Sequence, residues 1–456
     1  MAKEIASFKA AGDKAVLESL EKIKKDDSGI FITVCSAVKA APSGPLTGVP
    51  IAVSDNISVK DVETTGASKI LKGYIPPFSG KAVLDLEEAG AVIVGKTNMT
   101  EFGIFGAASA YGHTQNPHDK TRKAGPSGSA AAVAAGFVPA AVSSDAGGLL
   151  RVSASFCGTA AFKPSYGAVS RYGLIYYTGS LDQIGVTASN ISDAAFIAQI
   201  ISGNDSRDTT SLPDTLTYAD KIKIGDKPLD GVLIGIPEEF LEGVSADVMK
   251  TFDEAVSTLE KLGAVCKKFS MKTARYMQPI HDIIAAGESS AMLSKFDGTR
   301  FGPRAEADNW HDMIAKTRAL FGPVVRRRIM LGVHLLKSGQ YNDYYIKSLQ
   351  TRTLVIEEFE SVFKEYDLLI SPTTKDVAPA IDGACTCGCA DELSSHSAAI
   401  AGVDLAGLPA ATVPCGAVGK LPAGLQIIGG YLKDADVIAA AAAFEKAADF
   451  AGKGAV

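Results

Sequence analysis

Apolar residues recur with helical spacing at the start of the chain and then change to short continuous runs. Over residues 4–25 the spacing predicts one amphipathic helix with a single buried face, marked by Ile5, Phe8, Ala15, Val16, Leu20 and Ile23. From residue 48 onwards the apolar runs GVPIAVS and AGAVIVGKTN are separated by the helix-like LDLEEAG. Strands that alternate with crossover helices produce this pattern, so we expect an α/β sheet to begin there.

The middle of the chain, about 205–350, is more polar and contains the longest amphipathic segments. We expect it to be a helical insertion packed on the edge of the sheet, and residues 1–40 to form an N-terminal helical segment. The 456 residues are 46% hydrophobic and 21% charged, which is typical of a globular chain with a large core. The sequence therefore predicts a single domain over 1–456 of the α/β class.

Charge, hydropathy and cysteine content argue against a membrane-spanning protein and a disulfide framework. The net charge of −6 provides no overall basic field, so nucleic acid would be met through a local patch or a partner. No apolar run reaches the ~20 residues that span a bilayer, and the start MAKEIASFKAAGDKAV lacks a signal-peptide core. Seven cysteines in this length favour reduced thiols over a disulfide framework. We expect a soluble, cytoplasmic protein without membrane contact.

Two stretches rich in glycine and serine stand out, KAGPSGSAAAVAAG (123–136) and SSDAGGLLR (143–151). Small residues there let the backbone approach another group closely. Free N–H groups in such turns and at helix N-termini stabilise negative charge, including that of an oxyanion. Close packing of helix on sheet explains the same composition, and both explanations stay open at this level.

Together with GVPIAVSDNI, ETTGASKIL, GAVIVGKTNMTEFG, FCGTAAFKPSYGAVSRYGLI, SLDQIGV, FDGTRFG and LAGLPAATVPCG, these stretches resemble the amidase signature family. SRYGLI, SLDQIG and FDGTRFG are similar to its A-type members, which belong to tRNA-dependent amidotransferases. The resemblance implies an amidase-signature fold, with a mixed β-sheet sandwiched between layers of α-helices. It also implies glutamine hydrolysis by a serine nucleophile, which a lysine activates through a second, bridging serine while backbone N–H groups hold the oxyanion.

The chain departs from the family at each position of that catalytic unit. The nucleophile position, after the paired glycines, holds Leu149; the lysine position between PIAV and DN holds Ser54. The bridging serine position holds Gly125 or Pro126 in a loop about two residues shorter than the pattern. Leucine has no proton to lose and serine cannot replace the base, so the resemblance predicts a site without its catalytic residues.

Other residues of the implied pocket are retained or changed singly. Ser397 stands where the family has a substrate-binding carboxylate, whereas Arg352 in QTRTL matches the pattern. Asp145 and Arg151 flank the altered turn and are expected to hold it together through hydrogen bonds. The expected remnant pocket comprises Ser127, Ser144, Asp145, Gly147, Gly148, Arg151 and Arg352.

Three functional hypotheses follow. The first is a glutaminase-deficient scaffold or regulatory chain of the A type, with B-type and C-type amidotransferase proteins as partners and tRNA contacted only through the complex. The second is an amidase-fold binding protein that holds zinc through the CTCGC loop, although a flexible exposed loop explains that stretch equally well; its ligands would be Cys385, Cys387 and Cys389, with His396 or another cysteine as the fourth. The third is an amidase whose chemistry has moved to Ser127, Ser144 or Cys157.

Overall fold

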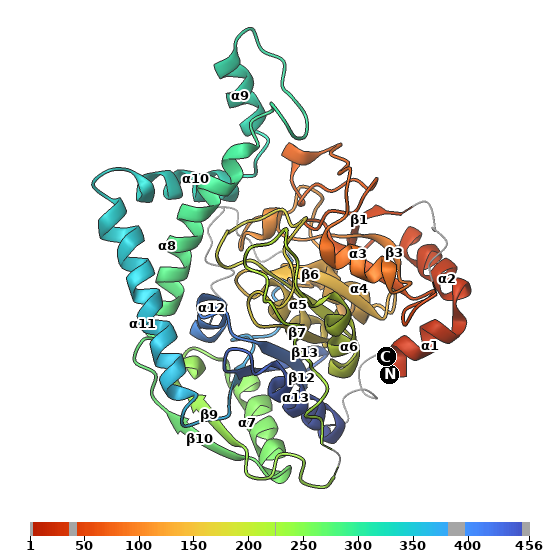
Figure 1. The fold of residues 1–456 in the computed structure, drawn as a ribbon, viewed down its shortest axis with the longest axis vertical. Helices are drawn as coiled ribbons and strands as arrows, with labels where there is room; N and C mark the ends of the chain where they lie inside the picture. Colours follow the sequence, from red (N-terminus) through yellow and green to blue (C-terminus); the bar gives the residue numbers. More distant parts are fainter. Residues whose placement is uncertain (1–2, 36–42, 224, 382–396, 449–456) are drawn as a thin grey trace.

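The computed structural model describes residues 3–35, 43–223, 225–381 and 397–448. Within them an 11-stranded sheet runs through the molecule (Figure 1). Its strands, in spatial order, are β1 (Phe31–Val34), β3 (Val92–Thr97), β2 (Pro50–Ser54), β6 (Ala140–Asp145), β8 (Gln183–Ala188), β7 (Ala160–Lys163), β12 (Ala410–Val418), β13 (Leu421–Gly429), β11 (Leu368–Pro372), β9 (Leu233–Pro237) and β10 (Val265–Phe269). A separate hairpin pairs β4 (Gln115–Asn116) with β5 (Asp119–Lys123).

Helices cover both faces of the sheet (Figure 1). Those near the sheet are α1 (Lys3–Ala11), α2 (Asp13–Lys24), α3 (Lys81–Glu88), α4 (Gly128–Ala134), α5 (Leu149–Cys157), α6 (Ile191–Ile201), α7 (Ala246–Lys261), α12 (Ala398–Leu405) and α13 (Asp434–Ala448). Those at the side are α8 (Ala274–Met292), α9 (Trp310–Arg318), α10 (Pro323–Leu336) and α11 (Lys347–Val362). The predicted α/β class, with a mixed sheet between helical layers, is confirmed.

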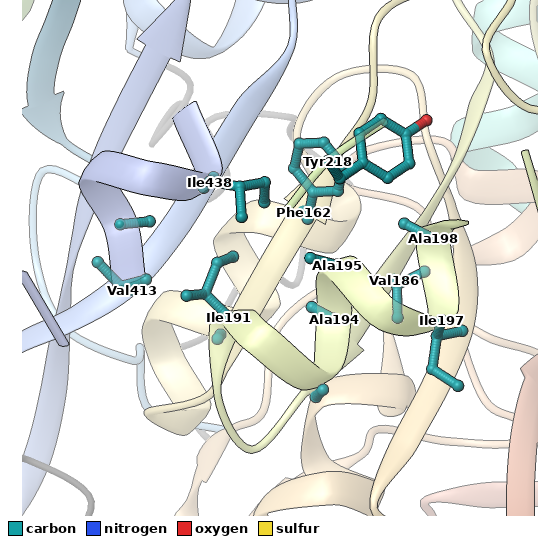
Figure 2. Packing of buried hydrophobic residues seen from close by; sticks show 14 of the residues in the cluster. Phe162, Val186, Ile191, Ala194, Ala195, Ile197, Ala198, Tyr218, Val413 and Ile438 are labelled. Atoms are coloured by element: carbon teal, nitrogen blue, oxygen red, sulfur yellow. The ribbon is translucent and has the colours of Figure 1, made fainter. Parts of the chain in front are cut away.

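Alternation along the strands divides the core into two layers. Ile51 and Val53 of β2 belong to the cluster beneath α3, α6 and α13, whereas Ala52 faces the cluster that contains α4. Figure 2 shows α6 of the first layer, where small alanines bring the helix close to Phe162 and Val186 of the sheet. Because successive side chains point to opposite faces, a strand with both faces covered is apolar throughout.

The middle region, which the sequence predicts to be a helical insertion, contains two strands as well as helices. It contributes β9 and β10, which pair in parallel and form one edge of the sheet. The amphipathic pattern of VSADVMKTFDEAVSTLEKLGAVCKKF (244–269) predicts a helix that includes residues 265–269. Helix α7 stops before Gly263, whose φ of +102° favours glycine. The chain then turns back, so the following VCKKF pairs with β9 instead of continuing the helix.

The predicted N-terminal helix is also divided. Gly12, with φ of 55°, separates α1 from α2. The backbone of the turn at Gly48 packs directly on this break, since a Cβ added at Gly48 would lie 2.8 Å from the Gly12 Cα. The break between α1 and α2 therefore coincides with the contact of Gly12 and Gly48, which the apolar spacing of residues 4–25 does not reveal. None of the helices described is long and apolar enough to cross a membrane.

Candidate functional site

The altered catalytic positions converge at the carboxyl ends of three adjacent strands. β2 lies between β3 and β6 and runs parallel to both, so the residues that follow these strands gather at one edge of the sheet. Ser54 is the last residue of β2, and Leu149 begins α5 after the turn that follows β6. Ligand sites of open α/β sheets form at such edges.

A chain of contacts links the segments that carry these positions. The Ser54 hydroxyl lies 3.3 Å from the Met99 sulfur, and Met99 in turn forms an isolated β-bridge with Ser127. The backbone N–H of Ser127 donates to the hydroxyl of Ser153 at 2.9 Å. Ser153 lies on α5, one helical turn after Leu149. The structure therefore brings together the three segments that the sequence singled out.

Leu149, at the predicted nucleophile position, is part of a buried apolar cluster. Leu149 is 1% exposed and packs in a cluster with Met99, Phe105 and Ile400. Gly103 leaves room for it, because a Cβ added there would lie 3.2 Å from the Leu149 Cδ2 atom. Leu149, which the sequence aligns with the nucleophile position, therefore packs among apolar side chains in this structure.

At Gly125, one of the two residues aligned with the bridging serine, there is no room for a side chain. Gly125 has a φ of +114°, and a Cβ added there would lie 2.7 Å from the Ser153 hydroxyl oxygen. A serine at this place would clash unless α5 moved. The shortened loop and the altered residue are therefore adapted to each other.

The glycine turn itself is held firmly, as expected from its flanking charges. Asp145 accepts a hydrogen bond from the Gly148 N–H at 2.5 Å and forms an ion pair with the Arg151 Nε at 2.9 Å. The buried Arg151 also donates to Asp404 at 2.7 Å and to Gln426 at 2.8 Å. Burial by itself would raise the pKa of Asp145, but attraction to Arg151 outweighs burial and lowers it; burial raises the pKa of Asp404 to about 7.

The glycine turn is buried, and an aliphatic side chain packs against it. Gly147 and Gly148 connect β6 to α5, and both are buried. A Cβ added at Gly148 would lie only 2.4 Å from the Ile400 Cγ2 atom, so the side chain of Ile400 covers the turn directly.

The three candidates for relocated chemistry all have structural contacts. Ser127 caps α4, and its hydroxyl accepts the Ser129 N–H at 3.3 Å. The Ser144 hydroxyl accepts from the Asn56 amide at 2.7 Å, and the Cys157 thiol donates to the Ala124 carbonyl at 3.2 Å. Burial raises the pKa of Cys157, which disfavours the nucleophilic thiolate.

A buried amine that the sequence analysis missed lies on β3. Burial lowers the pKa of Lys96 to about 8, and its Nζ atom lies 3.8 Å from the Asp55 carboxylate. The amine donates to the Ile57 carbonyl at 2.6 Å and to the Thr64 hydroxyl at 3.0 Å. These bonds anchor the segment after β2. The signal in the sequence was a lysine inside the apolar run AGAVIVGKTN.

Arg352, the retained residue of the pocket, lies in a different setting. Its guanidinium donates to the Leu405 carbonyl at 2.7 Å and to the Ser180 hydroxyl at 2.9 Å. It lines a cleft of about 1340 Å³ between α11 and α13, whose lining carries as many acidic as basic side chains. Ser397 caps α12 by accepting the Ile400 N–H at 3.4 Å, so it serves the helix rather than a substrate.

The proposed zinc ligands Cys385, Cys387 and Cys389, with His396, lie outside the described residues. Within the described part of the chain, no group of three or more His, Cys, Asp or Glu side chains is placed to hold a metal ion. The zinc hypothesis therefore still rests on the sequence alone.

Comparison with known proteins places this geometry in context. The model of the Amidase family matches residues 33–438. The A subunit of glutamyl-tRNA(Gln) amidotransferase from Methanococcoides burtonii is 45% identical over 429 residues, which cover 92% of this chain and 89% of that protein. The protein of the same name from Carboxydothermus hydrogenoformans is 41% identical over 471 residues, covering 98% of this chain and 95% of that protein.

Solved structures agree with the sequence relatives. The crystal structure of the glutamyl-tRNA(Gln) amidotransferase A subunit from Thermotoga maritima is similar with a TM-score of 0.81 at 35% identity, covering 95% of this chain and 91% of that one. A bacterial aryl acylamidase shares the fold, with a TM-score of 0.83 at 24% identity and coverage of 99% and 97%. The family model, the sequence relatives and the solved structure agree with the motifs and the sheet described above. The chain therefore belongs to the amidase signature family.

Proposed function

We propose that this chain is the A-type component of a tRNA-dependent amidotransferase and that it does not hydrolyse glutamine at the family's site. It acts instead as a scaffold or regulatory component for B-type and C-type partners, with tRNA contacted through the complex. The observation that carries the proposal is Leu149, an apolar packing residue at the nucleophile position. The names of its relatives support the assembly part of the proposal.

Chemical reasoning excludes the family reaction at this place. Acyl transfer by a serine enzyme needs a hydroxyl nucleophile and a base that accepts its proton. Leu149 has no hydroxyl, and Ser54 contacts a thioether rather than acting as a base. Without the catalytic residues, other serine hydrolases keep only ~10³-fold acceleration from binding and oxyanion donors. Here Ile400 covers the turn that would supply those donors.

Buried ion pairs hold the region around the glycine turn together, as a scaffold requires. Asp145 and Arg151 still fix the turn, and the ion pair from Arg151 to Asp404 ties α5 to α12 across the site. Removing either partner of a buried ion pair costs about 3–5 kcal/mol, which is a reason for such a network to persist after the chemistry is lost. A partner that uses free ammonia would need this chain as a structural component, but it would not need glutamine hydrolysis by it.

The test is reconstitution with purified B-type and C-type partners of the same organism and Glu-tRNA(Gln). We expect no glutamate release from glutamine above a no-protein blank, together with formation of Gln-tRNA(Gln) when ammonium chloride supplies the nitrogen. The matched control omits this chain, and ammonia-dependent product should then fall. Glutamate release that survives purification and is lost in Ser127→Ala would instead support relocated chemistry and overturn the proposal.

A second candidate function is zinc binding by the CTCGC stretch. Three cysteines within five residues offer thiolates, the preferred ligands of structural zinc, although Cys-x-Cys spacing is less typical than Cys-x-x-Cys. Zinc titration of the wild type against a Cys385→Ser, Cys387→Ser double variant tests it. Stoichiometric zinc binding by the wild type but not by the double variant would support a metal site. If the wild type binds no stoichiometric zinc, the zinc hypothesis is wrong.

A further inference from the structure

Helix α10 packs on the molecule through only one side. Val324, Val325 and Leu335 are buried, and Gly332 lets the helix approach α8 so closely that an added Cβ would lie 2.0 Å from the Ala286 carbonyl oxygen. Residues half a turn away from this seam must then face outward. In Figure 1 α10 lies at the outer side of α8, away from the sheet.

The outward side of α10 is both apolar and basic. Met330 is 72% exposed, Val333 is 61% exposed and Leu331 is 42% exposed. Arg326 and Arg327 are exposed one turn earlier, and the segment PVVRRRIMLGVHLL contains no acidic residue. We call these five residues the α10 face. A cluster of large exposed apolar side chains with arginines beside it is typical of an interaction surface.

An aromatic corner continues the α10 face. The π-helical turn Tyr341–Ile346 contacts α10 and leads into α11. Tyr341 and Tyr344 are 40% and 46% exposed, and Tyr341 stacks on Tyr345 with ring centroids 5.6 Å apart. Single π-helical turns often occur at functional sites, and tyrosine and arginine are enriched among the residues that dominate binding energy.

We propose that the α10 face, with Tyr341 and Tyr344, docks an acidic amphipathic helix of the B-type partner; this rests on the proposed function. The apolar stripe would receive the apolar side of that helix, and Arg326 and Arg327 would pair with its carboxylates. Two copies of this chain would place like charges opposite each other, which opposes self-association through this face. Phosphates of an RNA would pair with the arginines but leave Met330 and Val333 without apolar partners.

Isothermal titration calorimetry with the purified B-type partner tests the docking surface. The variant Met330→Glu, Val333→Glu changes only exposed side chains, so folding is retained and can be verified by circular dichroism. Leu17→Glu on α2, which is 59% exposed, is the matched control. We expect the double variant to weaken binding at least about tenfold, the control to bind like the wild type, and Arg327→Glu to weaken binding with reduced salt dependence.

The outcomes separate this inference from the proposed function. If the wild type binds and the double variant binds equally well, the docking surface is wrong while the proposed function stands. If the wild type does not bind the B-type partner, either alone or with the C-type partner present, both fail. If the double variant binds less well than the wild type only when tRNA is present, the face contacts RNA. If the wild type forms a dimer in sedimentation that the double variant abolishes, the face contacts a second copy of this chain. Either result would overturn docking of an acidic helix.

Discussion

Replacing Leu149 by alanine tests whether the former nucleophile position is now a packing position. The substitution removes three carbons from a buried site, which at about 0.8 kcal/mol per methylene amounts to about 2.4 kcal/mol. Met99, Phe105 and Ile400 surround Leu149, and Ile400 is held within α12, so we expect the cavity to close only partly and the loss of unfolding free energy to reach about 3 kcal/mol. Leu17→Ala on the exposed side of α2 should change it by less than about 0.5 kcal/mol.

Urea unfolding followed by circular dichroism measures these differences, with a shared denaturant slope for wild type and variants. The same preparations are assayed for glutamate release from glutamine. Leu149→Ser should be at least as destabilising as the alanine variant, because it leaves the cavity and buries a hydroxyl. It should also remain inactive, since Ser54 supplies no base. Unchanged stability in Leu149→Ala, or glutamine hydrolysis in Leu149→Ser, would refute the packing role.

Three further predictions follow from the same structure. Burial raises the pKa of Asp182 to about 7, so between pH 4 and 7 the folded state keeps a proton that the unfolded state has lost, and the unfolding free energy should fall as pH rises through this window. Asp182 contributes roughly 4 kcal/mol at most to this fall. Asp182→Asn should make the fall shallower in urea titrations without removing it, because burial also raises the pKa of Asp404 to about 7. Gly148→Ala should lower the thermal midpoint more than Gly136→Ala. Both glycines have positive φ, but a Cβ added at Gly148 would lie 2.4 Å from the Ile400 Cγ2 atom, whereas one added at Gly136 would meet nothing within 4 Å. Equal shifts would mean that Ile400 can move aside. Native protein treated with iodoacetamide should leave Cys157 unmodified in peptide mass spectrometry until it is unfolded, and rapid native alkylation would reopen this thiol as a nucleophile.

Much of the fold was accessible from the sequence because its signals are local. The apolar runs at 50–54 and 92–97 are strands, and the intervening helix is α3, as their periodicity predicts. VCKKF at 265–269 was missed because its strand state depends on pairing with β9, a partner remote in the sequence. The break at Gly12 was missed for a similar reason, since it accompanies packing against the turn at Gly48.

The candidate site divides in the same way. The sequence by itself determined what chemistry is excluded, because a leucine at position 149 has no hydroxyl in any fold. Only the tertiary structure decided what surrounds these positions: Met99 and Ile400 pack with Leu149, Ser127 caps a helix, and Arg151 joins Asp145 to Asp404. Bond-forming capacity belongs to a residue type, whereas burial, capping and ion pairing arise from residues far apart in the chain that folding brings into contact.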